Sequence, residues 1–175
     1  MRVLLLFMKN PYERYYLRET ARLLKMSPMT VKRSLDLLTK EKLLVKEKIK
    51  NQILYSANIE SPGFRHLKIA YNLAWFEKKE TVKFIKEMLP TMSSLVLYGS
   101  LAKGEDDEKS DVDFLVISQS KRAIDMELSQ HLGREVAVLN LTPAQWSEEA
   151  KKNRGLYLDV ITEGIVLYGT RPVVE

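Results

Sequence analysis

The chain has 175 residues, a net charge of +5 and no cysteine, so disulfides and thiolate-bound metals are excluded. No segment approaches the ~20 consecutive apolar residues of a membrane-spanning helix. The apolar start Met1–Met8 is too short for a signal peptide and lacks a small-residue cleavage site. We therefore expect a cytoplasmic protein of one large or two small domains, without a membrane partner.

Charge is distributed unevenly along the chain. Residues 1–60 contain thirteen Lys and Arg against six Asp and Glu, which gives +7, whereas residues 61–175 contain fifteen against seventeen, which gives −2. A basic segment joined to a slightly acidic one indicates that the first part contacts nucleic acid. The alternative at this stage is a basic surface that only keeps the protein soluble.

The first sixty residues predict a pair of helices. After a short helical run over Val3–Met8, apolar residues at helical spacing predict a helix over Leu17–Leu24. Ser27 is a suitable N-cap and Pro28 suits the first helical position, so the second helix is expected over about Pro28–Lys40. Two short helices joined by a tight turn form a helix-turn-helix.

A β-hairpin follows the helix pair. Apolar and polar residues alternate over 43–50 and 52–56, and Lys50-Asn51 forms the turn. A helix-turn-helix followed by a hairpin is a winged helix, and this segment resembles the winged-helix domains of bacterial and archaeal regulators. Such domains also make protein contacts, so the fold alone leaves the partner open.

The resemblance implies double-stranded DNA as a partner, because the second helix of such a pair places its first residues in the major groove. Arg33 is suited to reading a guanine, and Lys32 and Thr30 to holding phosphates. Alternate lysines on one hairpin strand share a face, and that face suits contact with phosphates. The alternative for each lysine taken alone is a solvent-exposed side chain without a partner role. The predicted DNA contacts are Ser27, Thr30, Lys32, Arg33, Lys46, Lys48 and Lys50.

A helical connector is expected next. Turn-forming residues at 58–63 mark a boundary, and residues 64–89 are mostly helical with an interruption at 77–80. Trp75 and Phe76 pack the two domains together, contact a second subunit or belong to the monomer core; the sequence leaves these alternatives open. A homodimer formed through the stripe Leu67, Ala70, Leu73 and Phe76 is one hypothesis.

The most informative motif lies within residues 97–117. An apolar strand ends at Gly99-Ser100, ten residues follow, and Asp111-Val-Asp113 opens a second strand. Residues i and i+2 of a strand share a face, so the two carboxylates repel each other unless a cation, usually a divalent metal, lies between them. Gly99 allows a phosphate to approach the backbone, and Ser100 adds hydrogen-bond donors. The alternative is an acidic turn before an edge strand with solvated aspartates.

The remaining elements alternate between helix and strand. We expect a helix over about Lys121–Leu132 with Gly133 as its C-cap, a strand over 135–141 and a helix that begins at Pro143. A further helix over Leu156–Thr162 precedes a last strand over Ile165–Tyr168. This alternation predicts a mixed α/β sheet.

The Gly-Ser motif, its ten-residue spacer and Asp-x-Asp resemble the DNA polymerase β-type nucleotidyltransferase superfamily in its minimal form. Tyr55-x-x-Asn58, Ser61-Pro62 and Leu132–Val136 extend the resemblance to winged-helix regulators fused to a minimal nucleotidyltransferase domain. The implied fold is α+β: a winged helix-turn-helix over 1–60, a helical connector over 61–90 and a mixed-sheet nucleotidyltransferase-like domain over 91–175.

The resemblance also implies a chemistry. Asp111 and Asp113 would be catalytic and hold Mg²⁺ or Mn²⁺, while Gly99 and Ser100 would bind the phosphates of an NTP. Lys103, in the spacer, either meets a phosphate or is solvated. An acceptor hydroxyl would attack the α-phosphorus in line and release pyrophosphate.

One position departs from the superfamily, whose active members carry a third carboxylate on the next central strand. Ala137 occupies that position here. Glu135, one pleat away on the same face, either substitutes for it as a catalytic group or is a surface residue. Two functions therefore stay open: a nucleotidyltransferase targeted by its winged helix, or a transcriptional regulator whose nucleotidyltransferase domain is catalytically degenerate. The sequence identifies neither the NTP nor the acceptor.

Overall fold

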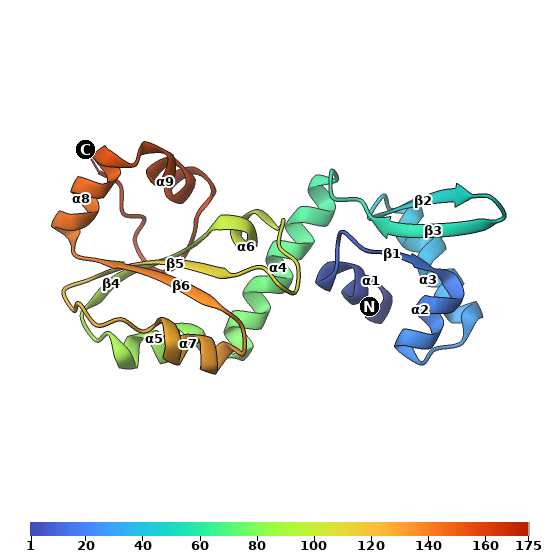
Figure 1. The fold of residues 1–175 in the computed structure, drawn as a ribbon, viewed down its shortest axis with the longest axis horizontal. Coiled ribbons are helices and arrows are strands. Elements are labelled where there is room, and N and C mark those ends of the chain that lie inside the picture. The colour runs from blue at the N-terminus through green and yellow to red at the C-terminus, as the bar shows by residue number, and fades with distance from the viewer. Residues whose placement is uncertain (175) are drawn as a thin grey trace. The chain divides into compact units, whose positions relative to one another are not determined.

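The computed structural model describes residues 1–174, which divide into two compact units, Met1–Lys68 and the chain from Ile69 onward (Figure 1). The boundary lies within helix α4 (Pro62–Lys78). None of the helices formed by residues 1–174 is long and apolar enough to cross a membrane.

The first unit contains three helices and a three-stranded antiparallel sheet. The helices are α1 (Arg2–Lys9), α2 (Leu17–Leu24) and α3 (Pro28–Lys40), and the strands are β1 (Arg14–Tyr16), β2 (Leu44–Ile49) and β3 (Gln52–Ala57). The strand order is β1-β3-β2. The predicted helices and hairpin are confirmed. Strand β1 was not predicted, because three residues are too few for a periodicity and it exists only through its pairing with β3.

Local chemistry explains why α3 and the hairpin form where they do. The Ser27 hydroxyl accepts the Thr30 N–H at 3.2 Å, and Pro28 is the first residue of the helix, as predicted. Val31 and Leu35 are fully buried and fix the inward face of α3. At the hairpin turn Lys50 adopts a left-handed conformation with φ of 55°.

The second unit begins in α4 and contains one mixed four-stranded sheet of order β6-β5-β4-β7. Strands β5 and β6 are parallel, whereas the β4–β5 and β4–β7 pairs are antiparallel, so the predicted mixed sheet is confirmed. The elements are α5 (Thr81–Met88), β4 (Met92–Tyr98), α6 (Gly99–Lys103), β5 (Val112–Ser118), α7 (Asp125–Leu132), β6 (Val136–Leu141), α8 (Pro143–Lys152), α9 (Arg154–Leu158), the π-helical turn η1 (Asp159–Glu163) and β7 (Ile165–Gly169).

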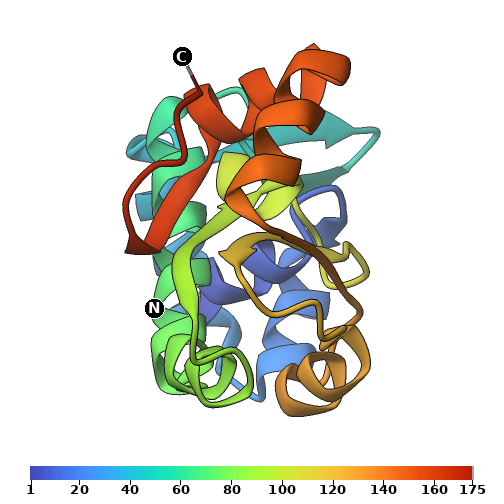
Figure 2. The same ribbon diagram turned by 90° about the vertical axis from the view of Figure 1, so that its left-hand side faces the viewer.

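Helices cover both faces of this sheet, with α5 and α7 on one side and α8 and α9 on the other (Figure 2). On the first side Phe114 and Leu97 pack with buried side chains of α5 and α7. On the second side Leu115 packs with Trp146 and Tyr157. Because β4 and β5 are buried on both faces, their sequences are apolar at successive positions rather than at alternate ones.

Two predicted helices are corrected by the structure. Helix α7 begins at Asp125 rather than Lys121, because the Asn140 side-chain amide donates to the carbonyls of Ser120 and Arg122, both at 2.9 Å, and holds this segment irregular. The helix predicted over Leu156–Thr162 begins at Arg154 and becomes π-helical at Asp159.

The position of Phe76 shows which of the three alternatives left open by the sequence applies to this residue. It is 3% exposed and its ring lies 5.4 Å from that of Phe114, so it belongs to the core of the second unit. Leu67 and Ala70, in contrast, are exposed. The homodimer stays a prediction.

Candidate functional site

The Gly-Ser motif lies where β4 ends and α6 begins. Tyr98, the last residue of β4, is in register with Asp113 on β5, which brings the motif next to the first residues of β5. Gly99 has φ of +70°, and a Cβ built on it would lie 2.3 Å from Asp113 Oδ2. Glycine is therefore required twice, once for its backbone conformation and once for the approach of the carboxylate.

The two aspartates flank a buried residue. Val112 is fully buried, Asp113 is half-buried and Asp111 is exposed. Burial raises the pKa of Asp113, and the negative charges of Asp111 and Asp159 raise it further. The electrostatic repulsion expected between the paired aspartates is therefore present, together with a contribution from Asp159 that the sequence did not predict.

The carboxylates of Asp111 and Asp113 supply only part of the ligand set that a divalent cation needs. Within residues 1–174 no group of three or more His, Cys, Asp or Glu side chains is placed to hold a metal ion. Mg²⁺ is commonly bound by one or two carboxylates, with water and substrate phosphates as the other ligands. The oxygen donors of Asp111 and Asp113 match that pattern, provided that a nucleotide completes the ligand set.

The strand register places Ala137 directly opposite Asp113. β5 and β6 run parallel, with Asp113 paired to Ala137 and Val112 to Val136. Glu135 precedes β6; its side chain is exposed, and its carbonyl accepts the Val112 N–H at 3.0 Å. The nearest position on the neighbouring strand to Asp113 therefore carries a methyl group.

Asn72 holds the first half of the loop that joins α6 to β5. This buried side chain of α4 donates to the Leu101 carbonyl at 3.1 Å and to Asp106 Oδ1 at 2.7 Å. Asp106 is only 1% exposed. A buried carboxylate is costly unless it is paired and hydrogen-bonded, and these contacts supply such partners.

Arg134 holds the second half of the same loop. Its guanidinium forms an ion pair with Asp106 at 3.7 Å and donates to the carbonyls of Asp107 and Ser110. Asp107 in turn accepts the Lys109 N–H at 2.8 Å and the Ser110 N–H at 2.9 Å, and these bonds lower its pKa, the bond from Lys109 most. The turn just before Asp111 is thereby fixed. Sequence reasoning missed both roles. Asn72 belongs to no motif, and Arg134 was noted only as part of the Leu132–Val136 segment of the family resemblance.

Lys103 is partly exposed and has an ion-pair partner. Its ammonium group forms an ion pair with Asp159, whose side chain is 26% exposed against 32% for that of Lys103. Tyr98 lies near the same groups: burial raises its pKa to about 12, and the charges of Asp113 and Asp159 contribute. Asp159 therefore belongs to the site, although only the tertiary structure brings the η1 turn to α6.

The residues predicted to contact DNA lie on two surfaces of the first unit. Ser27 and Thr30 are hydrogen-bonded to each other, with hydroxyls 2.8 Å apart, whereas Lys32 and Arg33 are exposed on α3. On the hairpin, Lys46 is in register with Tyr55 and Lys48 with Ile53, so each lysine shares a face with its partner. Both lysines and Lys50 are exposed.

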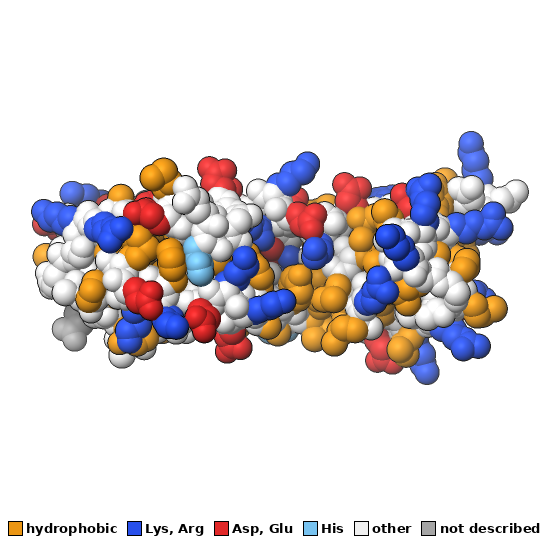
Figure 3. Space-filling view, turned by 90° about the horizontal axis from the view of Figure 1, so that it is seen from below, with side chains coloured by type: hydrophobic (Ala, Val, Ile, Leu, Met, Phe, Trp, Pro, Cys, Tyr) orange, Lys and Arg blue, Asp and Glu red, His pale blue; other side chains and the backbone are white. Residues whose placement is uncertain are grey.

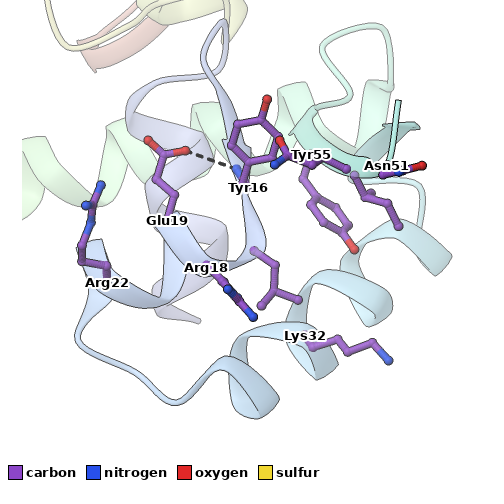
Figure 4. A pocket seen from close by; sticks show the side chains of 10 residues that line it. Tyr16, Arg18, Glu19, Arg22, Lys32, Asn51 and Tyr55 are labelled. Atoms are coloured by element: carbon purple, nitrogen blue, oxygen red, sulfur yellow. Dashed lines mark hydrogen bonds between the residues drawn. The ribbon is translucent and has the colours of Figure 1, made fainter. Parts of the chain in front are cut away.

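A groove of about 790 Å³ lies between α2, α3 and the hairpin (Figure 4). Arg18 and Arg22 of α2 and Lys32 of α3 contribute positive charge to its lining, and Figure 4 shows these three side chains. The complete lining is Tyr16, Leu17, Arg18, Glu19, Arg22, Lys32, Asn51, Gln52, Ile53 and Tyr55. Sequence reasoning missed Arg18 and Arg22, although their spacing of one helical turn was a usable signal.

Basic side chains are also prominent over the first unit in the space-filling view, where Lys and Arg outnumber Asp and Glu (Figure 3). Over the second unit the two signs are mixed in the same view. The uneven charge of the sequence is therefore visible on the surface.

Comparisons with known proteins identify the second unit. Residues 78–168 match the family described as "Nucleotidyltransferase domain". The chain belongs to this family, and the predicted nucleotidyltransferase domain is confirmed. A search among curated protein sequences found no match.

Some solved structures are similar over part of the chain. One is a toxin-antitoxin with AMP-PNP, at 23% identity and a TM-score of 0.44, which covers 54% of this chain and 74% of that one. Two are variants of the toxin-antitoxin MntA-HpeT: a tyrosine variant, at 20% identity and TM-score 0.39 over 54% and 73% of the chains, and an Asp-to-Glu variant, at 19% and 0.41 over 53% and 73%. The assignment to the family rests on the domain match.

Proposed function

We propose that the protein binds a divalent metal and an NTP through Gly99, Ser100, Asp111 and Asp113, and is targeted by a DNA-binding winged helix. The observation that carries the first part is the fit of the Gly99 backbone against the Asp113 carboxylate at neighbouring ends of β4 and β5. A side chain at position 99 would collide with the Asp113 carboxylate, so the arrangement requires glycine, and it lies within a domain of the nucleotidyltransferase family.

Each protein group has a defined task in this proposal. Asp111 and Asp113 would hold the metal, which when bound neutralises charge on the triphosphate. Gly99 and Ser100 bind phosphate oxygens, and Arg134 keeps the preceding loop in place. Transfer is an in-line attack of an acceptor hydroxyl on the α-phosphorus, with pyrophosphate as the leaving group.

Ala137 supports the alternative function, a regulator whose domain binds nucleotide but does not transfer it. Opposite Asp113 no carboxylate is present to accept the proton of the acceptor hydroxyl. Incubation with each labelled NTP and Mg²⁺ or Mn²⁺ separates the two functions: incorporation of label into protein or nucleic acid supports the enzyme, and binding without incorporation supports the regulator.

Calorimetry tests the metal–nucleotide site itself. We expect metal-dependent binding of an NTP to the parent chain and its loss in the Asp111→Asn/Asp113→Asn variant. The Glu87→Gln/Glu148→Gln variant removes the same charge from exposed helical positions and should bind normally. Equal binding by the double Asn variant would overturn the proposal.

The DNA-binding winged helix is supported by the helix pair, the hairpin, the groove and the concentration of positive charge in the first unit. Binding of the full chain to a DNA duplex should weaken steeply with salt, because phosphate contacts release counterions. Absence of any salt-sensitive binding would overturn this part alone.

The homodimer is proposed separately. Winged-helix regulators commonly read two half-sites about 34 Å apart, which requires two copies. Sedimentation equilibrium at micromolar concentration checks it, and a single species of 20.3 kDa would exclude it under those conditions.

A further inference from the structure

Lys103 and Asp159 form an ion pair beside the candidate site. Lys103 is the last residue of α6, and Asp159 is the first residue of the π-helical turn η1. About a quarter to a third of each side chain is exposed, so the pair lies at the edge of the protein rather than in its core. Partly exposed ion pairs contribute little to stability, and opening this one therefore costs little.

The short helix α6 connects this pair to the Asp113 carboxylate. Gly99, at its first position, lies against Asp113, and Lys103 lies one turn further on. Tyr98, the residue before the helix, is near both Asp113 and Asp159. Asp159 is paired with Lys103, and the negative charges of Glu105 and Glu163 also act on this lysine.

A triphosphate placed at Gly99 and Ser100 would enter this cluster of negative charge. The Lys103 ammonium group is a compact, rotatable cation on a flexible stem, which suits it to changing partners. Phosphate oxygens are strong acceptors of charge-assisted hydrogen bonds. The charge on Asp159, in contrast, disfavours the approach of a polyanion.

We propose that Asp159 is the resting partner of Lys103 and that the triphosphate of the nucleotide displaces it. Lys103 moves from the carboxylate to a phosphate oxygen, and Asp159 is left to solvent. Asp159 thereby weakens nucleotide binding, because it competes with the triphosphate for Lys103. This inference rests on the proposed nucleotide site, which it deepens by adding a competitor for the triphosphate.

The test compares three single variants of the full chain by calorimetry with MgATP, and with inorganic tripolyphosphate without metal. Asp159→Asn should tighten binding of both ligands about threefold to tenfold. Lys103→Met should weaken both about tenfold. Glu148→Gln is the control, because it removes one negative charge from an exposed position of α8 and should change binding less than twofold.

The outcomes separate the alternatives. Weaker binding by Asp159→Asn would overturn the proposal and make Asp159 a residue that positions Lys103 for phosphate. An equal effect of Asp159→Asn and Glu148→Gln would overturn it in favour of a general charge effect. If the parent chain binds no nucleotide, the proposed function fails as well; if the parent binds through Asp111 and Asp113 while Asp159→Asn is neutral, only this inference fails.

A second measurement uses the unaltered chain, in case a variant does not fold. In a protein labelled with ¹³C at lysine Cε, the Lys103 signal is assigned by its loss in Lys103→Arg. MgATP should move this signal when the ion pair opens. A signal that stays in place at saturating MgATP would contradict the exchange.

Discussion

The two units of this chain form candidate sites in opposite ways. In the first unit, the residues expected to contact DNA are exposed side chains of neighbouring segments, α2, α3 and the hairpin. In the second unit, the proposed metal–nucleotide site combines half-buried groups with the exposed Asp111. Hydrogen bonds from α4 and from the α7–β6 connection and an ion pair with η1 hold the segment around it. The first site depends on surface charge, whereas the second depends on tertiary packing.

This difference has energetic consequences. Interactions between exposed charges and phosphates are screened by salt and are distributed over many residues, so single substitutions in the first unit should have modest effects. Groups in the second unit lie in a partly desolvated environment, where one misplaced atom affects the whole site. Five predictions test this contrast, in order of decreasing expected effect.

The largest effect is expected at Ala137, opposite Asp113. If turnover is limited by the missing third carboxylate, Ala137→Asp should raise the rate of nucleotidyl transfer by about 10²–10⁴, the usual contribution of a general base. Ala137 is exposed, so the new charge should be tolerated. Ala137→Asn has nearly the same shape and should leave the rate unchanged.

Glu135 decides between two explanations of any activity in the parent chain. Loss of transfer in Glu135→Ala would show that Glu135 substitutes for the third carboxylate. Robust transfer by the parent that survives Glu135→Ala would show that position 137 is not where this protein needs a carboxylate.

Gly99 should be more sensitive to substitution than Gly133, another glycine with positive φ. Gly99→Ala introduces both a strained φ and a contact of 2.3 Å with the Asp113 carboxylate, so we expect about 3 kcal/mol of destabilisation and loss of nucleotide binding. Gly133→Ala has the same φ of +70° but nothing within 4 Å, and should cost only about 1 kcal/mol. Denaturant unfolding measures both; equal costs would mean that the carboxylate moves aside.

In the first unit, Arg33→Ala should weaken binding to a specific DNA site by about 1–3 kcal/mol more than binding to random duplex, if Arg33 reads a base. Lys48→Ala and Arg18→Ala should weaken both alike and reduce the salt slope by about one each, because they meet phosphates. Fluorescence anisotropy at several salt concentrations measures these effects. Lys40→Ala, an exposed cation at the end of α3, serves as control, and a loss as large as that of Arg18→Ala would argue against a groove-specific contact.

The smallest effect concerns Asp107, which holds the turn before Asp111. Asp107→Ala should cost about 1–2 kcal/mol at neutral pH through lost hydrogen bonds. The folded-state pKa of Asp107 is lowered from 3.8, so its stabilising effect is present above the unfolded pKa and is lost as pH falls through the folded one. The difference between parent and variant should therefore shrink in acid, and a difference independent of pH would contradict this assignment.

The sequence by itself determined the features that depend on near neighbours. Capping by Ser27 and Pro28 set the start of α3, alternation set the hairpin, and the apolar runs set β4 and β5. The Gly-Ser and Asp-x-Asp spacing was sufficient to predict the family, because these residues act within one short strand–loop–strand segment. Such features need only the local backbone and side-chain period.

Only the tertiary structure decided which distant groups complete the site. The fold brought Asn72 and Arg134 to the motif loop, and the π-helical turn brought Asp159 to Lys103. None of these pairs has a periodicity or a spacing that a sequence displays. They arise because burial of both faces of the sheet fixes the helices around it, and the polar groups then find partners where that packing places them.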